Sequence, residues 1–404
     1  MSRPLAPVPD HVPPHLVVPF DYMNPPGPPN DPHRAWMRLH DGPDIIYTPY
    51  NGGHWLPTRA EDIQEVFRHT ERFGGYPNTI PKELGSREYP APPLGVNSAA
   101  EHAPFRRVMA ARLSPRVVAS MEDFIRRLAI DLIERFRARG RCEFVSEFAA
   151  RYPIEIFLGL IGVPLEQRDV LVPLAETRMR DPDFNAQLGA IEKLFGFIHE
   201  VFEERRARPG EDLFSAIVHM DVDGRPISHS ELMGMGLTIL LGGLDTVMSA
   251  LSFMTRFLAE NPAHRRQLLE DPALIPAARD EMLRRFAAPN LTRCVQYDFN
   301  YKGVPFRKGD MVLVATCLQG LDARRFPDPL RVDFHRADDL QYFSTFGGGI
   351  HRCVGVYLAS AELRIFLEEW LRRIPDFAIE PGSEVQACSG SVMCVTRLPL
   401  AWAA

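Results

Sequence analysis

The stretch Phe346-Gly347-Gly348-Gly349-Ile350-His351-Arg352-Cys353-Val354-Gly355 is a glycine-rich loop that brings one cysteine to the start of an amphipathic helix expected at 356–374. A cysteine that binds a metal must be a thiolate, and the free N–H groups and positive dipole end of a helix N-terminus favour that anion. Glycines let the backbone approach the sulfur, where N–H groups withdraw electron density from it. The loop therefore predicts that Cys353 is a metal ligand. For a lone cysteine, the alternative is a buried structural thiol.

The bulk composition is that of an ordinary globular protein. The chain has 404 residues, of which 45% are hydrophobic and 24% charged, so it can form two domains or one large unit. Its net charge of −6 argues against a nucleic-acid partner. The six cysteines show no C-x-x-C spacing, which fits a reducing compartment. No signal peptide and no apolar run of ~20 residues is present, so we expect a cytoplasmic protein without a membrane anchor.

Helical periodicity dominates the chain, and a few segments have strand character. Residues 1–30 hold ten prolines, so we expect an extended arm over 1–40 and a single domain over 41–404. Strands are expected on both sides of Asn51-Gly52-Gly53, in a hairpin over 301–316 and in 377–402. The expected helices lie at about 60–69, 104–138, 154–162, 166–179, 186–208, 211–220, 229–260, 262–270, 273–287 and 356–374. This pattern predicts a mainly α fold with a minor β region.

The helix expected at 229–260 is apolar almost throughout and should cross the interior. Ser228 with Glu231 reads as a capping box at its start. In its middle, Gly242-Gly243-Leu244-Asp245-Thr246 places two glycines and a carboxylate, although each glycine costs ~1 kcal/mol against alanine and a buried carboxylate needs a partner. Close helix packing, with Thr246 bonding back to the carbonyl four residues earlier, is the structural explanation. A functional acid–alcohol pair is the other.

Together these motifs resemble the cytochrome P-450 superfamily. The cysteine loop matches its signature F-x-x-G-x-x-x-C-x-G, the central helix matches [A/G]-G-x-[D/E]-T, and Glu281-Met282-Leu283-Arg284 matches E-x-x-R. Leu240-Leu241-Gly242-Gly243-Leu244-Asp245-Thr246-Val247 and Arg373-Ile374-Pro375-Asp376-Phe377 are similar to the camphor-monooxygenase family among the soluble bacterial members. The resemblance implies a triangular, mostly helical cytochrome P-450 fold with small sheets, and haem b held by Cys353.

The resemblance also implies roles for individual residues. Asp245 and Thr246 would relay protons to dioxygen, and Arg336 would complete a structural charge network with Glu281 and Arg284. The residues expected to contact the haem are His102, Arg106, Arg293 and His351, which would face its propionates, and Phe346, Gly347 and Gly242. The positions expected to line the substrate pocket are Thr79, Tyr89, Gly95, Thr238, Leu241, Pro289, Leu291 and Val392.

The implied activity is insertion of one oxygen atom from dioxygen into a C–H bond of a small hydrophobic, terpenoid-type substrate. Camphor enzymes use a tyrosine to hold the ketone, but Tyr89 in Tyr89-Pro90-Ala91-Pro92-Pro93 is out of register, so an ionone-like norisoprenoid is favoured over camphor. Electrons would come from NADH through an FAD-dependent reductase and a [2Fe-2S] ferredoxin. Arg106, Arg107, Arg112 and Arg352 would offer the ferredoxin a basic docking patch, or they are scattered solvated arginines.

Two other activities fit a haem-thiolate protein. A peroxygenase of the same fold would use hydrogen peroxide directly, but such enzymes typically lack the acid–alcohol pair found at Asp245-Thr246. A gas sensor or haem carrier would not need that pair above an open pocket, and no fused output domain is visible in the sequence.

Overall fold

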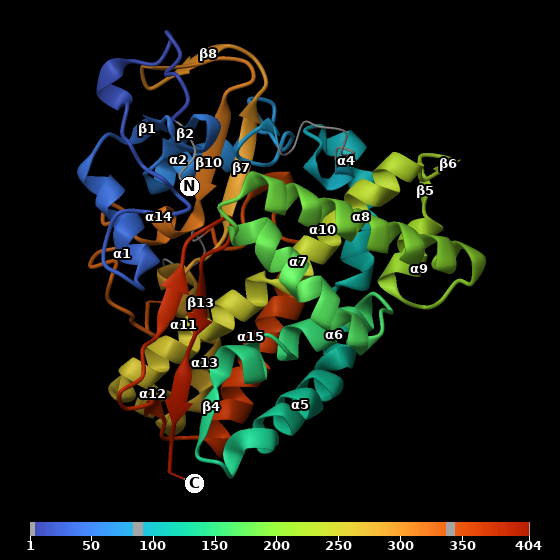
Figure 1. Cartoon of the computed structure of the whole chain (residues 1–404), viewed down its shortest axis with the longest axis vertical. Coiled ribbons are helices and arrows are strands. Elements are labelled where there is room, and N and C mark those ends of the chain that lie inside the picture. The colour runs from blue at the N-terminus through green and yellow to red at the C-terminus, as the bar shows by residue number, and fades with distance from the viewer. Residues whose placement is uncertain (1–4, 84–91, 337–343, 404) are drawn as a thin grey trace.

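The computed structural model describes residues 5–83, 92–336 and 344–403 and shows a mainly helical protein with small sheets (Figure 1). The predicted fold class is thereby confirmed. The helices are α1 (Pro32–Met37), α2 (Ala60–Arg68), α4 (Ala99–Arg112), α5 (Pro115–Arg137), α6 (Tyr152–Leu160), α7 (Arg168–Arg180), α8 (Phe184–Ala207), α9 (Leu213–Val218), α10 (His229–Leu244), α11 (Thr246–Glu260), α12 (Pro262–Glu270), α13 (Ile275–Arg285), α14 (Thr316–Gly320) and α15 (Val356–Arg373).

The largest sheet lies beside the helical body, in the upper left of Figure 1 near α2 and α14. Its strand order is β1-β2-β10-β7-β3. The strands are β1 (Ile45–Thr48), β2 (His54–Pro57), β3 (Phe73–Gly74), β7 (Asn290–Val295) and β10 (Met311–Ala315). Strands β1 and β2 form the hairpin expected around Asn51-Gly52-Gly53, with Tyr47 opposite Trp55. Strand β10 pairs with β7 along its whole length, so the sheet joins segments far apart in the sequence.

Four smaller sheets complete the β component of the described residues. A three-stranded sheet has the order β11-β14-β4, and three two-stranded sheets pair β12 with β13, β5 with β6 and β8 with β9. The strands are β4 (Arg141–Glu143), β5 (Asp221–Val222), β6 (Arg225–Pro226), β8 (Phe299–Tyr301), β9 (Val304–Phe306), β11 (Ala378–Ile379), β12 (Gln386–Cys388), β13 (Cys394–Arg397) and β14 (Pro399–Ala401). The β12–β13 hairpin packs against α11.

The proline-rich N-terminal segment runs along the sheet. The Ala6 N–H donates to the Pro49 carbonyl at 2.9 Å, and the Val18 N–H donates to the Tyr47 carbonyl at 2.9 Å. Phe20 is buried in the common hydrophobic core. The segment is not entirely extended, since α1 follows the prolines with Asp31 as its N-cap, where the Asp31 carboxylate accepts from the Arg34 N–H.

Two helices that the periodicity predicted as continuous are each divided in two. The segment expected at 104–138 becomes α4 and α5, because Ser114 is extended and Pro115 begins a new helix. The segment expected at 229–260 begins with the predicted capping box of Ser228 and Glu231, but it breaks at Asp245, whose φ is −134° and ψ −38°. The apolar period continues through both breaks, so hydrophobicity alone does not reveal them.

By length and composition, the segment His229–Glu260 is the one helical stretch among the described residues that could cross a bilayer. More than half of its most apolar window, 56%, is buried inside the protein. Figure 1 shows α10 and α11 running through the middle of the molecule between the other helices. This position explains the apolar composition as that of a core helix.

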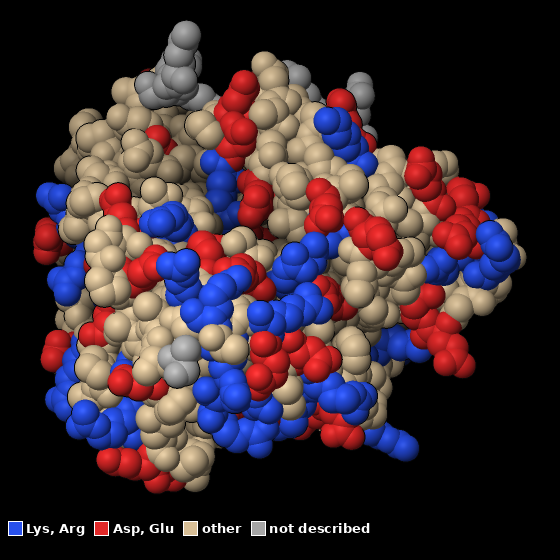
Figure 2. Space-filling view, turned by 60° about the horizontal axis from the view of Figure 1, so that its bottom comes forward, with Lys and Arg blue, Asp and Glu red and all other residues tan. Residues whose placement is uncertain are grey.

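Charges of both signs are mixed on the face shown in Figure 2. Ion pairs also join α5 to α15, where Arg126 lies 2.6 Å from Glu368 and Arg364 lies 2.7 Å from Glu122. An interspersed surface of this kind provides no extended basic stripe for a polyanion on that face.

Candidate active site

The loop before α15 holds Cys353 in a tight turn. The Cys353 N–H donates to the Phe346 carbonyl at 2.8 Å, and Gly347 and Gly349 have φ values of 67° and 63°. A Cβ on Gly349 would lie 2.2 Å from the Phe67 carbonyl oxygen, so this position requires glycine. The glycine-rich pattern is thus explained by close packing of the loop against α2.

The Cys353 sulfur is accessible because it faces an internal cavity of about 140 Å³. Gly242, Thr246 and Leu358 also line this cavity, which therefore separates the cysteine loop from the end of α10. Of the other cysteines, none lines it. Cys394 instead lies on β13 with its sulfur 3.4 Å from that of Cys388.

Burial raises the pKa of the Cys353 thiol, while a hydrogen bond from the Gly355 backbone and the charges of Arg106 and Arg352 act in the opposite direction. The expected stabilisation by the helix is weaker than desolvation, because α15 begins only at Val356. A thiol in such a place becomes a thiolate when a bound cation supplies the missing charge. The donor and its surroundings therefore fit a metal ligand.

The end of α10 forms the opposite wall of the cavity. A Cβ on Gly242 would meet no atom within 4 Å, so a side chain there would extend into the open space. Gly243 instead packs on Phe157, which a Cβ would approach to 2.3 Å. The Thr246 hydroxyl donates to the Gly242 carbonyl at 3.0 Å. Both structural explanations for this motif thus hold, and Thr246 in addition borders the cavity.

Asp245 is 1% exposed and points away from solvent at the break between α10 and α11. One of its carboxylate oxygens forms an ion pair with Arg180 at the end of α7, and the other is buried with no hydrogen-bond partner among the described residues. Burial alone would lower the pKa of Arg180, but the negative charge of Asp245 outweighs it and raises the pKa. Arg180 lies 65 positions before its partner, so no local pattern predicted this ion pair.

Four of the predicted haem-binding residues surround the cysteine loop. His102 and Arg106 lie on α4, Arg293 on β7 and His351 in the loop itself. The rings of His102 and His351 meet edge to face at 5.2 Å, and His351 Nδ1 lies 2.9 Å from the Leu94 carbonyl oxygen. The loop and α4 are thereby brought together at one edge of the cavity.

These side chains have nitrogen atoms that could still form hydrogen bonds with an anion. His102 Nε2, His351 Nε2 and Arg293 Nε are buried with no hydrogen-bond partner among the described residues. Burial lowers the pKa of Arg293 to about 10, and burial together with Arg293 and His102 lowers the pKa of His351 to about 4. A buried carboxylate would reverse both effects. The cluster therefore fits the two propionates of haem b.

The predicted charge network is assembled away from the cavities. The Arg284 guanidinium, fully buried, donates to both oxygens of Glu281 at 2.8 Å, and Arg336 Nε donates to Glu281 at 3.2 Å. Arg284 also donates to the backbone carbonyls of Pro329 and Arg331. The network thus ties α13 to the segment that precedes the cysteine loop.

We expect Arg284→Met to lower the free energy of unfolding by about 3–5 kcal/mol, because Glu281 would remain buried with part of its charge uncompensated. Arg331→Met is the matched control. Its guanidinium is largely exposed and lies 3.7 Å from Asp333, so its loss should cost less than about 1 kcal/mol. Denaturant unfolding of both variants measures the difference, and equal losses would contradict the buried network.

A second cavity, of about 260 Å³, adjoins the first at Gly242 and Thr246. Six of the predicted pocket residues line it, namely Thr79, Thr238, Leu241, Pro289, Leu291 and Val392. Gly95 does not, because its backbone packs against Gly75, where a Cβ would lie 3.0 Å from the Gly75 oxygen. Tyr89 lies outside the described residues.

Further residues that the sequence analysis did not predict also line this cavity. These additional lining residues are Tyr22, Tyr76, Asn78, Ile80, Pro92, Arg178, Met179, Ile191, Gly234, Leu237, Asn290, Thr292, Leu313 and Ser391. They come from segments spread over the chain, including the N-terminal segment, α7, α8, α10, β7, β10 and the β12–β13 loop. In the cavity beside Cys353, the overlooked group is Glu362, whose pKa burial raises well above its usual range.

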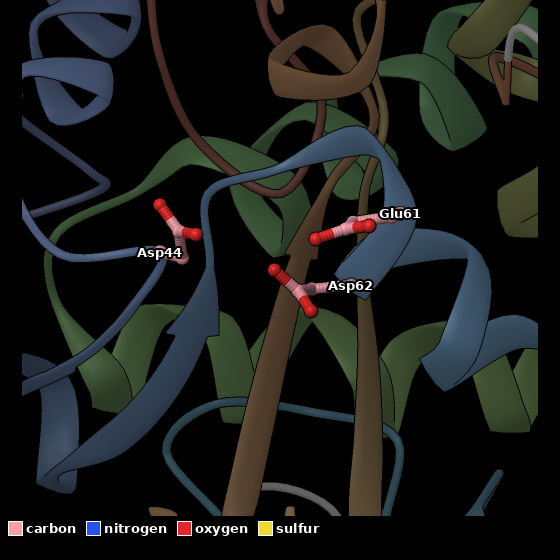
Figure 3. A group of neighbouring side chains, drawn as sticks. All are labelled: Asp44, Glu61 and Asp62. Carbon is pink, nitrogen blue, oxygen red and sulfur yellow. The ribbon is translucent and has the colours of Figure 1, made fainter. Parts of the chain in front are cut away.

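A group of three carboxylates, Asp44, Glu61 and Asp62, lies apart from this site (Figure 3). Their oxygens lie within 4.8 Å of one another. Asp44 is paired with Arg59 at 2.9 Å, and Asp62 with Lys302 at 2.8 Å. Since cations already offset these charges, the group is explained as a partly buried ion-pair network.

Comparison with known proteins agrees with this geometry. The family model for cytochrome P450 matches residues 170–396. A probable cytochrome P450 127A1 from Sinorhizobium fredii is 33% identical over 98% of this chain and 97% of its own length. A vitamin D(3) 25-hydroxylase from Pseudonocardia autotrophica is 28% identical over 92% of this chain and 93% of its own.

Two solved structures superpose on nearly the whole chain. CYP101J2 is 34% identical and covers 99% of this chain and all of its own, with a TM-score of 0.88. Cytochrome P450 CYP101C1 is 37% identical and covers 98% of this chain and all of its own, also with a TM-score of 0.88. Cys353 lines a cavity, and buried nitrogen atoms of His102, Arg293 and His351 have no hydrogen-bond partner among the described residues. Since relatives also match from end to end, the chain belongs to the cytochrome P450 family of haem-thiolate monooxygenases, which use haem b.

Proposed function

We propose that Cys353 supplies the axial thiolate of haem b and that His102, Arg106, Arg293 and His351 hold its propionates. The support is that Cys353 lines a cavity and that buried nitrogen atoms of His102, Arg293 and His351 have no hydrogen-bond partner among the described residues. The bound haem supplies the activation of dioxygen, and the protein holds and orients the reactants.

Arg293→Met is expected to accelerate haem loss and to stabilise the haem-free protein. The guanidinium is 7% exposed and burial lowers its pKa to about 10, so its charge is unfavourable until a carboxylate arrives. Haem transfer to apomyoglobin measures the first effect, and thermal unfolding of the haem-free protein measures the second. The exposed Arg307→Met is the control, and a variant that keeps its haem as well as the unchanged protein would contradict the assignment.

We propose that Thr246 and Asp245 carry protons to the cavity. Thr246 lines both cavities, and its hydroxyl donates to the Gly242 carbonyl in the weakened last turn of α10. Asp245 is paired with Arg180 and almost inaccessible, so proton transfer through it requires this ion pair to loosen. Arg180 therefore acts as a positioning residue, because its ion pair holds the Asp245 carboxylate in place next to Thr246.

We propose a substrate of terpenoid size, with an ionone-like norisoprenoid favoured over camphor. The observation that carries this is the 260 Å³ cavity, which reaches Thr246 and has apolar walls at Ile80, Leu241 and Val392. Polar residues among the lining, including Tyr76 and Asn78, could offer a hydrogen bond to a carbonyl or hydroxyl of the substrate.

A titration of the ferric protein with small terpenoids tests this proposal. A substrate that fills the cavity would change the spin state of the bound haem, and the absorption spectrum would report this low-spin to high-spin change. NADH consumption and product formation with ferredoxin and reductase present then distinguish substrates from compounds that bind but are not oxidised. If macrolides or fatty acids shift the spectrum and terpenoids do not, the proposed substrate class is wrong.

We propose a [2Fe-2S] ferredoxin, reduced by NADH through an FAD-dependent reductase, as the electron donor. Arg107, Arg112 and Arg352 are exposed on α4 and beside Cys353, with Arg106 half-buried behind them. The charges of Arg106 and Arg352 act on Cys353, so these two arginines would give the cysteine side a local basic character that an acidic ferredoxin would recognise.

At limiting ferredoxin, turnover is expected to fall several-fold between low salt and 0.5 M salt, because exposed charges are screened over a few ångströms there. Arg352→Gln should weaken this dependence, while Arg141→Gln, exposed on β4, should leave it unchanged. The dependence of the apparent KM for ferredoxin on ionic strength is the measurement. A KM that does not change with salt would rule out docking by charge.

A further inference from the structure

Two cysteines face each other across the β12–β13 hairpin. Cys388 and Cys394 are directly opposite in the strand register, and their sulfurs lie 3.4 Å apart. Directly opposed residues in an antiparallel pair have Cα atoms about 4.5–5.5 Å apart, within the range of about 4.4–6.8 Å that a disulfide requires. Forming the bond would bring the sulfurs together by little more than about 1 Å, to the S–S length of about 2.05 Å. Side-chain rotation alone is enough for this.

The surroundings of the pair differ from those of a packed apolar thiol. The groups that act on Cys388 are Cys394 on β13, Arg180 on α7 and Asp245 between α10 and α11. A hydrogen bond from Cys394 lowers the pKa of Cys388 to about 7, burial opposes this and Arg180 assists it. Cys388 is half-buried while Cys394 is 2% exposed. Cys388 is therefore the thiol that a small oxidant can reach, and the buried Cys394 thiol lies next to it, with the two sulfurs 3.4 Å apart.

The hairpin loop connects this pair to the substrate cavity. Ser391 and Val392, which lie between the two cysteines, line the cavity. The Ser391 N–H donates to the Met179 carbonyl at 3.0 Å, next to Arg180. Arg180 in turn pairs with Asp245, so the charge state of the cysteines acts on the same guanidinium as the carboxylate.

We propose that Cys388 and Cys394 form a peroxide-sensitive dithiol that closes to a disulfide. The Cys388 thiol reacts with hydrogen peroxide to give a sulfenic acid and water. The Cys394 thiol then displaces a second water from the sulfenic sulfur, so two thiols and one peroxide give one disulfide and two waters. The oxidant is available at this position, because hydrogen peroxide is the by-product when dioxygen is reduced without product being formed.

The consequence for turnover rests on the role proposed for Asp245. In the reduced protein, a negative charge on the cysteine pair would act on Arg180 together with the charge of Asp245. The disulfide is neutral, so after oxidation Arg180 holds Asp245 more tightly. If the acid must leave Arg180 to deliver protons, oxidation slows turnover, and a reductant restores it.

The first experiment does not depend on turnover. The haem-loaded protein, with its iron capped by imidazole, is treated with one equivalent of hydrogen peroxide, alkylated and mapped by mass spectrometry. We expect a peptide linked through Cys388 and Cys394 that has lost two hydrogen atoms, and unchanged alkylation of Cys142. Two free thiols after treatment, or a sulfinic acid at Cys388 without the link, would overturn the proposal.

The second experiment uses Cys394→Ser, which removes the resolving thiol, with Cys142→Ser on β4 as the matched control. In the unchanged protein and in Cys142→Ser, peroxide pretreatment should lower ferredoxin-driven turnover about fivefold, which is the smallest effect typical of energetic coupling between two sites. Dithiothreitol should restore the turnover. In Cys394→Ser no dithiothreitol-reversible loss is expected. If the disulfide forms but turnover is unaffected, the dithiol stands, and the role assigned to Asp245 is wrong.

Discussion

Replacing Cys353 by serine is expected to abolish the strongly red-shifted Soret band that the reduced protein shows with carbon monoxide, together with all monooxygenase activity. The band would report that a thiolate holds the haem, and Cys353 is the one among the described cysteines that lines the cavity between the loop and α10. Electron donation by a thiolate favours O–O cleavage in this class of enzyme, and a serine oxygen cannot donate comparable electron density. Difference spectroscopy of the dithionite-reduced protein is the measurement.

Cys394→Ser is the matched control for this prediction. Cys394 is also buried in the C-terminal region, but it lies on β13 against Cys388 and does not line the cavity. The control should keep the red-shifted band. The assignment fails if Cys353→Ser keeps this band, or if Cys394→Ser loses it.

Thr246→Ala is expected to continue consuming NADH while releasing most of the reduced dioxygen as hydrogen peroxide. The rate of product formation should fall by at least about tenfold. This is a conservative value, because a positioned proton donor usually contributes about 100-fold or more to the rate. The hydroxyl borders both cavities and is held by its 3.0 Å bond to the Gly242 carbonyl, so methyl substitution removes the proton relay with little change in packing. Parallel assays of NADH, peroxide and product give the coupling ratio.

Thr246→Ser is the conservative control, because it retains the hydroxyl at the same position. Its coupling should stay near that of the unchanged protein, and the folding stability of both variants should be similar. Full coupling of NADH to product in Thr246→Ala would show that the hydroxyl acts only as a helix constraint through its bond to Gly242.

Local motifs made much of the site predictable. Cys353, Asp245 and Thr246 lie in short segments whose residue types are required by loop and helix geometry, so they can be recognised within ten positions of sequence. Glu281 and Arg284 are one helical turn apart, and this spacing alone placed them on one face. Six of the predicted pocket positions also line the cavity, but these positions came from the resemblance to the camphor-monooxygenase family and not from a local motif.

Predictions failed where a long-range contact decided the conformation. The periodicity predicted one helix over 229–260, but the chain breaks at Asp245, where the carboxylate is drawn to Arg180 after two glycines. Gly95 was expected in the pocket, yet its backbone is committed to packing against Gly75. Such contacts join positions with no common period, so hydrophobic patterning contains no signal for them.

The sequence by itself determined that this chain is a haem-thiolate protein with a mainly helical core, because a loop signature and apolar periodicity are local properties. The tertiary structure alone decided which groups share each site: Arg180 beside Asp245, Cys388 beside Cys394, and His102 beside His351. The physical reason is that burial and charge compensation depend on segments brought together by folding. The pKa of a side chain and its access to a cavity are therefore set by neighbours distant in the sequence.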